Sequence, residues 1–503
     1  MEPILISSMN RIVVLCAVST ADECHRPREA NAMNTISTRK TITEPARDIE
    51  VCREVDVLVV GGGPGGIGSA LAAARSGANT VLVERYGHLG GMATGGLVTI
   101  IPNLSNINGE QQIAGICQEL VDRLDVRGAT DYPKKEDWGS TDEMLVKRYI
   151  DSNLAWFYIR EDLNIGKKRV LYTALVDPEI LKCELNTMME EAGVKLYLHS
   201  WGTRPIVDGN TVKGVFIENK SGRQAILAKV VIDCTGDGDL LQPAGAECDT
   251  RMIPGLRIAA FAFPFWIGNI NMQKVEEFRA SQPDKYAELM QDLGKQGGAA
   301  FYLKDLVKCH DGVVWFHPFF PSLNQADINE INRVELEGRK KMLLSYEFYR
   351  KNVPGFENSY IALSSPQLGI QGGQRVVGEY VCTEKDITSD EIFDDTIAVF
   401  PDNDNGEISA RHPNVCIPYR SLVPKKIDGL LVACRAFSSE YQFNEYFNLI
   451  PHCIAMGQAA GTAAALAVQA CIQPRAIDCY VLQKQLLHQG VILPAKIKKM
   501  RLS

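Results

Sequence analysis

The stretch DVLVVGGGPGGIGSALAAARSGANTVLVERYGHLGG, residues 56–91, decides the fold of this chain. The apolar run at residues 55–60 predicts a buried parallel strand, and the small residues after the glycines predict a helix through Ala74. A second strand is expected at residues 80–83 and ends at Glu84, roughly 20 residues beyond the glycines. Strand, glycine turn, helix and second strand together form one nucleotide-binding β-α-β unit.

Three glycines of the turn have separate roles in such a unit. Gly61 supplies the tight turn, Gly63 lets the backbone approach a pyrophosphate, and Gly66 lets the helix lie close to the sheet. The first amides of the helix, at the positive end of its macrodipole, can bind phosphates without a basic side chain. Glu84 is placed to accept hydrogen bonds from ribose hydroxyls.

Size and composition are those of an ordinary globular protein with room for two or more packed regions. The chain has 503 residues, of which 46% are hydrophobic and 23% charged, and a formal net charge of -8. This mild, dispersed negative charge gives no indication of a nucleic-acid partner. No metal site is predicted.

The cysteines indicate a reducing compartment. The chain has 14 of them without a Cys-x-x-Cys pair, and Cys234, Cys434 and Cys453 lie within apolar runs. This is the pattern of buried, reduced thiols, so we predict a cytoplasmic protein without a redox-active disulfide.

Two segments could be mistaken for targeting or membrane signals. Residues 1–50 lack periodicity, and the apolar run at 12–18 is short for a signal peptide, so we predict a disordered leader, with Met33 a plausible alternative start. Residues 454–472 are long enough to span a membrane, but alanine and glycine dominate and Gln458 and Gln469 interrupt them. We expect a buried helix there and no membrane partner.

In the rest of the chain, segments typical of a cofactor-binding domain flank a segment of different character. A helix is expected at 178–192, followed by strands at 195–199, 205–208, 211–219, 224–228 and 230–233, the last ending in a second glycine turn. Residues 260–375 are rich in aromatic clusters, with helices expected at 272–293 and 328–349, as in an inserted substrate domain. A strand at 429–433 and a small-residue helix after Asn448 then resume the first pattern.

Three motifs now stand in order along the chain. They are the Gly-x-Gly-x-x-Gly unit, the turn DCTGDGD at 233–239, and LLVACR at 430–435 followed by MGQAAG at 456–461. Together they resemble the glutathione-reductase-like FAD fold, in particular the FAD-dependent oxidoreductases related distantly to fumarate reductase flavoproteins, over roughly residues 40–480. The resemblance implies an α/β protein with a three-layer ββα, Rossmann-like FAD-binding domain and an inserted α+β substrate domain.

The resemblance also implies a division of the chain. The FAD-binding domain takes residues 51–100, 166–260 and 376–480. A cap or substrate segment takes 101–165, the substrate domain 261–375, and a C-terminal tail 481–503.

The cofactor residues follow from the same resemblance. Those expected to contact FAD are Gly61, Gly63, Pro64, Gly65, Gly66, Glu84, Arg85, Gly90, Gly91, Met92, Thr94, Thr235, Gly236, Asp237, Arg435, Gly457, Gln458, Ala459 and Gly461. The spacing of His88 differs from that of relatives with a covalent flavin link, so we expect FAD to be held non-covalently. A second glycine fingerprint is missing, which argues against a separate NAD(P)H domain.

Candidate catalytic residues lie in the second half of the chain. His452 or Tyr419 could handle a proton, and Arg375 or Arg411 could clamp a substrate oxygen. His317 belongs to the wider set of candidates. Structural roles compete with each of these: a capping or core histidine, a loop tie, or an ion pair between Arg375 and Glu379.

These observations predict an FAD-dependent oxidoreductase that moves a hydride between a small organic substrate and flavin N5, with oxygen or another acceptor reoxidising the flavin. The direction of transfer stays open. A fumarate-reductase-like ene-reductase and a non-catalytic flavin-binding protein are the alternatives.

Overall fold

The computed structural model describes residues 41–151, 159–162, 164–304, 310–401 and 411–502. Most of the predicted leader, residues 1–40, lies outside this range. Residues 41–50 are described and form no helix or strand before the first strand begins at Val51.

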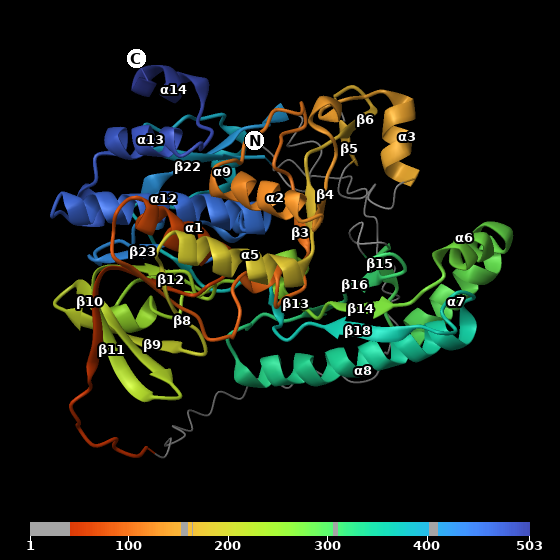
Figure 1. The fold of residues 1–503 in the computed structure, drawn as a ribbon, viewed down its shortest axis with the longest axis horizontal. Coiled ribbons are helices and arrows are strands. Elements are labelled where there is room, and N and C mark those ends of the chain that lie inside the picture. The colour runs from red at the N-terminus through yellow and green to blue at the C-terminus, as the bar shows by residue number, and fades with distance from the viewer. Residues whose placement is uncertain (1–40, 152–158, 163, 305–309, 402–410, 503) are drawn as a thin grey trace, which may run out of the picture.

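A seven-stranded sheet forms the centre of the nucleotide-binding half (Figure 1). Its order is β8-β2-β1-β11-β10-β9, with β23 also paired to β11. Its members are β1 (Val51–Val60), β2 (Thr80–Val83), β8 (Lys195–Tyr197), β9 (Trp201–Asp208), β10 (Thr211–Asn219), β11 (Gly222–Asp233) and β23 (Leu430–Val432). The β8, β2, β1, β11 and β23 pairings are parallel, whereas β9, β10 and β11 form an antiparallel meander. A mixed α/β sheet with a Rossmann-like parallel part is therefore confirmed.

Two helices rich in small residues cover the parallel strands. They are α1 (Pro64–Arg75) and α12 (Ile450–Gln469). A Cβ atom added at Gly457 would lie 2.1 Å from the carbonyl oxygen of Gly65, and one at Gly461 2.1 Å from that of Ser69. Glycine thus lets the two helix backbones touch, and α12 is buried along most of its length, as predicted.

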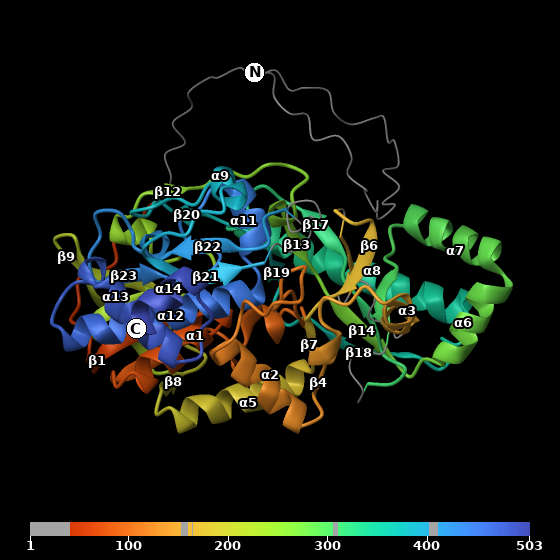
Figure 2. The same cartoon turned by 90° about the horizontal axis from the view of Figure 1, so that it is seen from above.

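The part of the chain expected to form the substrate domain, here called the substrate half, extends to the other end of the molecule (Figure 2). Its main elements are the sheet of β15 (Phe301–Lys304), β16 (Val314–Phe316), β14 (Phe265–Gly268) and β18 (Tyr360–Ser364), with helices α6 (Met272–Ser281), α7 (Pro283–Lys295) and α8 (Ile328–Asn352). A second small sheet joins β17 (Phe319–Pro321), β13 (Ala260–Ala262) and β19 (Gly369–Ile370). The predicted aromatic cluster is core here, since Phe261, Phe263, Phe265 and Phe316 are fully buried together.

The remaining elements connect and cover these two halves. They are β3 (Ile100–Ile101), α2 (Ile116–Val126), β4 (Thr130–Asp131), α3 (Glu143–Asp151), β5 (Ile159–Asp162), β6 (Lys167–Val170), β7 (Ala174–Val176), α5 (Pro178–Glu191), β12 (Cys248–Asp249), β20 (Arg375–Val376), α9 (Glu384–Thr388), β21 (Thr396–Phe400), β22 (Val415–Pro418), α11 (Tyr441–Phe447), α13 (Cys479–His488) and α14 (Ala495–Leu502). The predicted C-terminal tail thus holds part of α13 and all of α14, and buries Leu482, Leu486 and Ile497.

Two sequence predictions need correction. The helix expected at 272–293 is divided into α6 and α7, because Gln282 precedes Pro283 and takes a non-helical conformation. The strands expected at 224–228 and 230–233 are one strand, β11, because β1 pairs with it in parallel through Lys229 without a turn.

No single helix among the described residues is long and apolar enough to cross a membrane. Taken together, α11 and α12 have the length and composition of a membrane span, but the two helices are bent by 99° relative to one another.

Candidate active site

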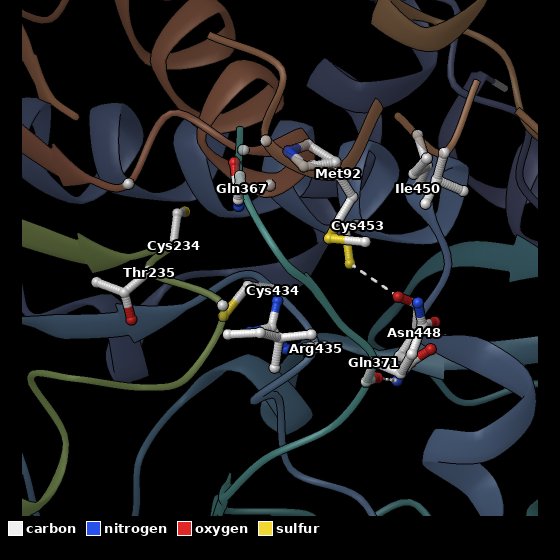
Figure 3. A pocket seen from close by; sticks show the side chains of 18 of the residues that line it. Met92, Cys234, Thr235, Gln367, Gln371, Cys434, Arg435, Asn448, Ile450 and Cys453 are labelled. Atoms are coloured by element: carbon white, nitrogen blue, oxygen red, sulfur yellow. Dashed lines mark hydrogen bonds between the residues drawn. The ribbon is translucent and has the colours of Figure 1, made fainter. Parts of the chain in front are cut away.

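One cavity of about 670 Å³ runs between the nucleotide-binding half and the substrate half. One end is lined by the glycine turn after β1 and the turn after β11, and the other by residues of the substrate half and the segment before α12. Figure 3 shows Cys234 and Thr235 at one side of this space and Gln371 and Asn448 at the other. We call the first part the nucleotide end and the second part the chamber.

The nucleotide end has the form of a backbone cradle. A Cβ atom at Gly61, where φ is +101°, would lie 2.2 Å from the carbonyl oxygen of Cys234, so only glycine fits the turn. At Gly63 the nearest atom to an added Cβ is 3.9 Å away, and Gly63 lines the cavity. Gly63 therefore leaves open space that any side chain would fill, which is what a closely approaching pyrophosphate requires.

Glu84 lies at the end of β2, where its carboxylate accepts hydrogen bonds from the backbone N–H groups of Gly62 at 2.6 Å and Tyr86 at 2.8 Å. Burial raises the pKa of this carboxyl group, although the two amides oppose the change. Beside it, the Arg85 guanidinium lies 5.3 Å from the ring centre of Trp201. Glu84, Arg85 and Trp201 all line the cavity, so they could hold the ribose and base of a dinucleotide.

A buried aspartate organises the second turn. Asp233 accepts hydrogen bonds from the Thr235 amide at 3.0 Å, the Thr235 hydroxyl at 2.7 Å and the Leu240 amide at 3.1 Å. These bonds fix the turn that brings Thr235 and Gly236 to the cavity. Asp239 also lines the cavity, and burial together with the charges of Asp237 and Asp233 raises its pKa to about 7. It can therefore donate or accept a hydrogen bond near neutral pH.

Three thiols line the middle of the cavity. Cys234, Cys434 and Cys453 are buried there and are free, as are the other cysteines of the described ranges. Burial raises the pKa of the Cys453 thiol to about 12, and the pKa values of Cys234 and Cys434 rise for the same reason. They stay protonated and apolar at neutral pH.

The structure divides the cofactor residues expected from the sequence into two groups. Those that line the cavity are Gly61, Gly63, Pro64, Gly65, Glu84, Arg85, Gly91, Met92, Thr235, Gly236 and Arg435. The remaining residues are outside its lining: Gly66, Gly90, Thr94, Asp237, Gly457, Gln458, Ala459 and Gly461. Two of these support a lining residue directly: Gly66 contacts the Gly61 carbonyl, and Asp237 accepts a 2.5 Å hydrogen bond from Arg435.

The residues of α12 that were expected to contact FAD, Gly457, Gln458, Ala459 and Gly461, lie away from the cavity. The helix begins at Ile450, so Gly457 and Gly461 lie beyond its first turn and contact α1 instead. Backbone amides at such positions donate hydrogen bonds to carbonyl groups within the helix, whereas the amides of the first turn have no acceptor within the helix. Asn448, Leu449 and Ile450 line the cavity, so the start of α12 is the part of the helix that reaches it.

Arg257 is the central polar group of the chamber. It belongs to a short helical turn (Arg257–Ala259), and its guanidinium donates to Gln371 Oε1 at 3.0 Å, to Asn448 Oδ1 at 2.7 Å and to the Glu445 carbonyl. Asn448 in turn donates to the Gln371 carbonyl at 2.9 Å. Asn448 therefore helps to hold an arginine that comes from another segment of the chain.

His317 follows β16 and lies between two aromatic rings that also line the chamber. Its ring centre is 4.5 Å from that of Trp315 and 4.6 Å from that of Phe319. Burial, with the nearby positive charge of Arg257, lowers the pKa of His317 to about 3. His317 is therefore neutral at physiological pH, and it lines the chamber.

The sequence of residues 56–486 matches the family described as FAD dependent oxidoreductase. The match covers the cradle, the second turn, the chamber and α12. The chain belongs to this family. The protein is therefore an FAD-dependent enzyme, and the sequence-based predictions of an oxidoreductase and of FAD as cofactor are confirmed.

Solved structures with a similar arrangement are distant in sequence. A geranylgeranyl bacteriochlorophyll reductase-like protein from Thermoplasma acidophilum is 13% identical, with a TM-score of 0.41 over 89% of this chain and 83% of its own. A myxobacterial chondrochloren halogenase is 14% identical (TM-score 0.40; 86% and 78% of the two chains), and the L-amino acid deaminase of Proteus myxofaciens is 13% identical (TM-score 0.39; 86% and 93%). A comparison with curated proteins found no match. We therefore transfer no substrate from these proteins to this oxidoreductase.

The two proton handlers expected from the sequence lie behind the cavity wall of the oxidoreductase. His452 is fully buried and stacks on Phe400 at 4.3 Å between ring centres, and the Leu449 amide donates to its Nδ1 at 3.4 Å. Tyr419 is buried too, and its hydroxyl donates to the Pro474 carbonyl at 2.9 Å. Neither residue lines the cavity, so these positions match the structural alternatives of a capping histidine and a loop tie.

The two expected clamps are also outside the cavity lining. The buried Arg375 guanidinium donates to the carbonyl groups of Ser439, Gly373 and Arg251 and lies 3.3 Å from Asp249. Glu379, the pairing partner considered above, instead bonds Arg475. Arg411 is exposed.

We expect His452 to make the enzyme acid-sensitive. Burial and the charge of Arg257 lower its pKa from 6.5 to about 3, so between these values the unfolded chain binds a proton that the folded enzyme does not. Stability then rises with pH through this window and is lost as pH falls, with a slope of up to about 1.4 kcal/mol per pH unit for one proton. His452→Gln should reduce this slope in urea unfolding at pH 4 to 6.5, and the exposed His488→Gln should not. Equal slopes in all three proteins would contradict the assignment.

Sequence reasoning missed Arg257, Gln371 and the part played by Asn448, and it named His317 without singling it out. Arg257 has a weak signal, because a lone arginine after Gly255 belongs to no motif. Only tertiary contacts bring it to Asn448, which is 191 residues away in sequence.

Proposed function

We propose that this enzyme transfers a hydride between a small organic substrate and FAD, and that the substrate occupies the chamber. One observation carries the proposal: a single cavity joins the glycine cradle to a chamber that contains Arg257 and His317. A dinucleotide at the cradle would thus have its reactive end directed to a cavity region with both a cation and a neutral imidazole. The antiparallel meander beside a parallel sheet supports the glutathione-reductase-like subclass of the fold.

When bound, FAD supplies the hydride acceptor or donor, so the chain must hold the cofactor, position the substrate and move one proton. Gly61, Gly63 and Pro64 would hold the phosphates, Glu84 the ribose, and Thr235 and Gly236 the middle of the molecule. His88 is absent from the cavity lining, which supports non-covalent binding.

Arg257 and His317 would perform the two other tasks, substrate binding and proton transfer. Arg257, held by Gln371 and Asn448, would bind a substrate oxygen, and a ring nitrogen of His317 would accept or return the proton that accompanies the hydride. A substrate anion beside Arg257 would offset one of the two causes that lower the pKa of His317, so substrate binding would make His317 a stronger base. Trp315 and Phe319 restrict water around the imidazole.

We also propose the domain limits given above, a cytoplasmic location, a small-molecule substrate without a nucleic-acid or membrane partner, and oxygen or another compound as electron acceptor. The free, buried thiols support a reducing compartment.

An anaerobic screen tests the proposed function. The oxidised holoenzyme is mixed with single metabolites and its flavin absorbance is followed; the dithionite-reduced holoenzyme is tested in parallel with activated alkenes. We expect rapid bleaching by at least one oxidisable metabolite and reoxidation on admitting air. Reoxidation of the reduced enzyme by alkenes alone would support an ene-reductase, and no reaction in either direction would support a binding-only flavoprotein.

A further inference from the structure

The Arg257 guanidinium forms no ion pair with a carboxylate group of the described residues. It is bonded to three neutral oxygens, those of Gln371, Asn448 and the Glu445 backbone. The Glu445 carboxylate oxygens accept instead from the backbone amides of Arg257 at 2.8 Å and Ile258 at 2.9 Å. Among the residues that the structure describes, no salt bridge involves the Arg257 side chain.

Two N–H groups of this guanidinium have no partner among the described residues. Arginine has five N–H groups, and three of them make the bonds above; one of the other two is Nε, which is buried. A buried donor without an acceptor is costly, and an unpaired buried charge more so. A negatively charged ligand in the chamber would compensate the charge of this guanidinium, because Arg257 lines the cavity.

The rest of the chamber is largely apolar, and no acidic residue of the described chain lines it. Arg160 lines the cavity on β5, whose Ile159 packs in one cluster with Trp315 and Ile100. The acidic residues of the lining, Glu84 and Asp239, belong to the nucleotide end. Trp315, Phe319, Ile370 and Leu449 give the chamber apolar walls.

We infer that the chamber binds an organic carboxylate with an apolar body, and that Arg257 is the residue that selects for the carboxylate. This inference rests on the proposed function, because it names the substrate class of the same site. A hydrogen bond between a guanidinium and a carboxylate is charge-assisted, and it is therefore stronger than one to a neutral acceptor. A phosphate is less suitable, because most donors of this guanidinium already bind chain oxygens and the surrounding walls are apolar.

The experiment measures binding without turnover. Holoenzyme is titrated with benzoate, phenylacetate and acetate, with the neutral isostere benzamide, and with inorganic phosphate, while the flavin absorbance spectrum is followed. We expect benzoate or phenylacetate to perturb the flavin spectrum, with a Kd at least about tenfold lower than that of benzamide, since charged hydrogen bonds are the stronger ones. We expect phosphate not to compete.

Variants locate the effect at Arg257. Arg257→Gln should weaken carboxylate binding at least about tenfold and leave benzamide binding unchanged, whereas Arg257→Lys should recover part of the loss. Arg333→Gln, on the outer surface of α8 where Arg333 pairs with Glu330 and Glu337, is the matched control. Flavin content and circular dichroism confirm that each variant is folded.

The outcomes separate this inference from the proposed function. Equal binding of benzoate and benzamide, competition by phosphate, no perturbation by any carboxylate, or unchanged carboxylate affinity in Arg257→Gln would overturn it, even if a neutral metabolite bleaches the flavin. Carboxylate binding that depends on Arg257, in an enzyme that no metabolite reduces, would support the inference while the proposed function fails.

Discussion

Gly63→Val should give a folded protein that binds FAD much more weakly than the wild type. The backbone at Gly63 has φ of -72°, which valine adopts, and the nearest atom to an added Cβ is 3.9 Å away, so the fold tolerates the side chain. The same side chain enters the space that the phosphates need. Overpacking of this kind costs about 1–3 kcal/mol, so FAD should bind about 10- to 100-fold more weakly.

The measurement is a fluorescence titration of apoprotein with FAD. Gly294→Val is the matched control, because Gly294 lies in α7 with no atom within 4 Å of an added Cβ. It should keep wild-type affinity. Wild-type affinity in Gly63→Val would mean that the cofactor phosphates lie elsewhere.

His317→Gln should slow flavin reduction by about 100-fold or more while FAD stays bound, because the proton that leaves the substrate loses its acceptor. His317 faces the chamber between Trp315 and Phe319, whereas His452 lies behind the wall against Phe400. Anaerobic stopped-flow with the metabolite found in the screen measures the reduction rate at saturating substrate. A lower rate with little change in substrate affinity is expected.

The exposed His488→Gln is the control for His317→Gln. An unchanged reduction rate in His317→Gln would contradict the assignment. If His452→Gln alone slowed flavin reduction, His452, one of the two proton handlers expected from the sequence, would carry the proton.

The cofactor half of the fold could be predicted because its determinants are local. Gly61, Gly63 and Glu84 stand at spacings that a β-α-β unit imposes, and the structure places all three in the cavity lining. The resemblance also brought in the turn at Thr235 and Gly236. The predicted limits of two elements were wrong because a neighbouring residue or strand sets them. Pro283 divides the helix expected at 272–293, and pairing with β1 makes β11 one continuous strand.

The chamber could not be predicted, because its residues come together only in three dimensions. Arg257, His317, Gln371 and Asn448 lie on separate segments, and no periodicity or spacing relates them. Arg375 shows the converse. Its position near a cofactor-type segment suggested that it clamps a substrate oxygen, but its guanidinium donates hydrogen bonds to backbone carbonyl groups and pairs with Asp249 inside the fold. A charged residue in a conspicuous segment is therefore weak support for a site until its hydrogen-bond partners are known.

The central claim is that the cradle holds one FAD without a covalent bond. The most direct test is to precipitate the purified enzyme with trichloroacetic acid and to quantify FAD in the supernatant and the pellet. We predict about one FAD per chain in the supernatant and a colourless pellet, because His88 is absent from the cavity lining and the cradle binds through backbone groups. A yellow pellet would contradict non-covalent binding, and absence of FAD from both fractions, also after incubation with excess FAD, would contradict the cradle itself.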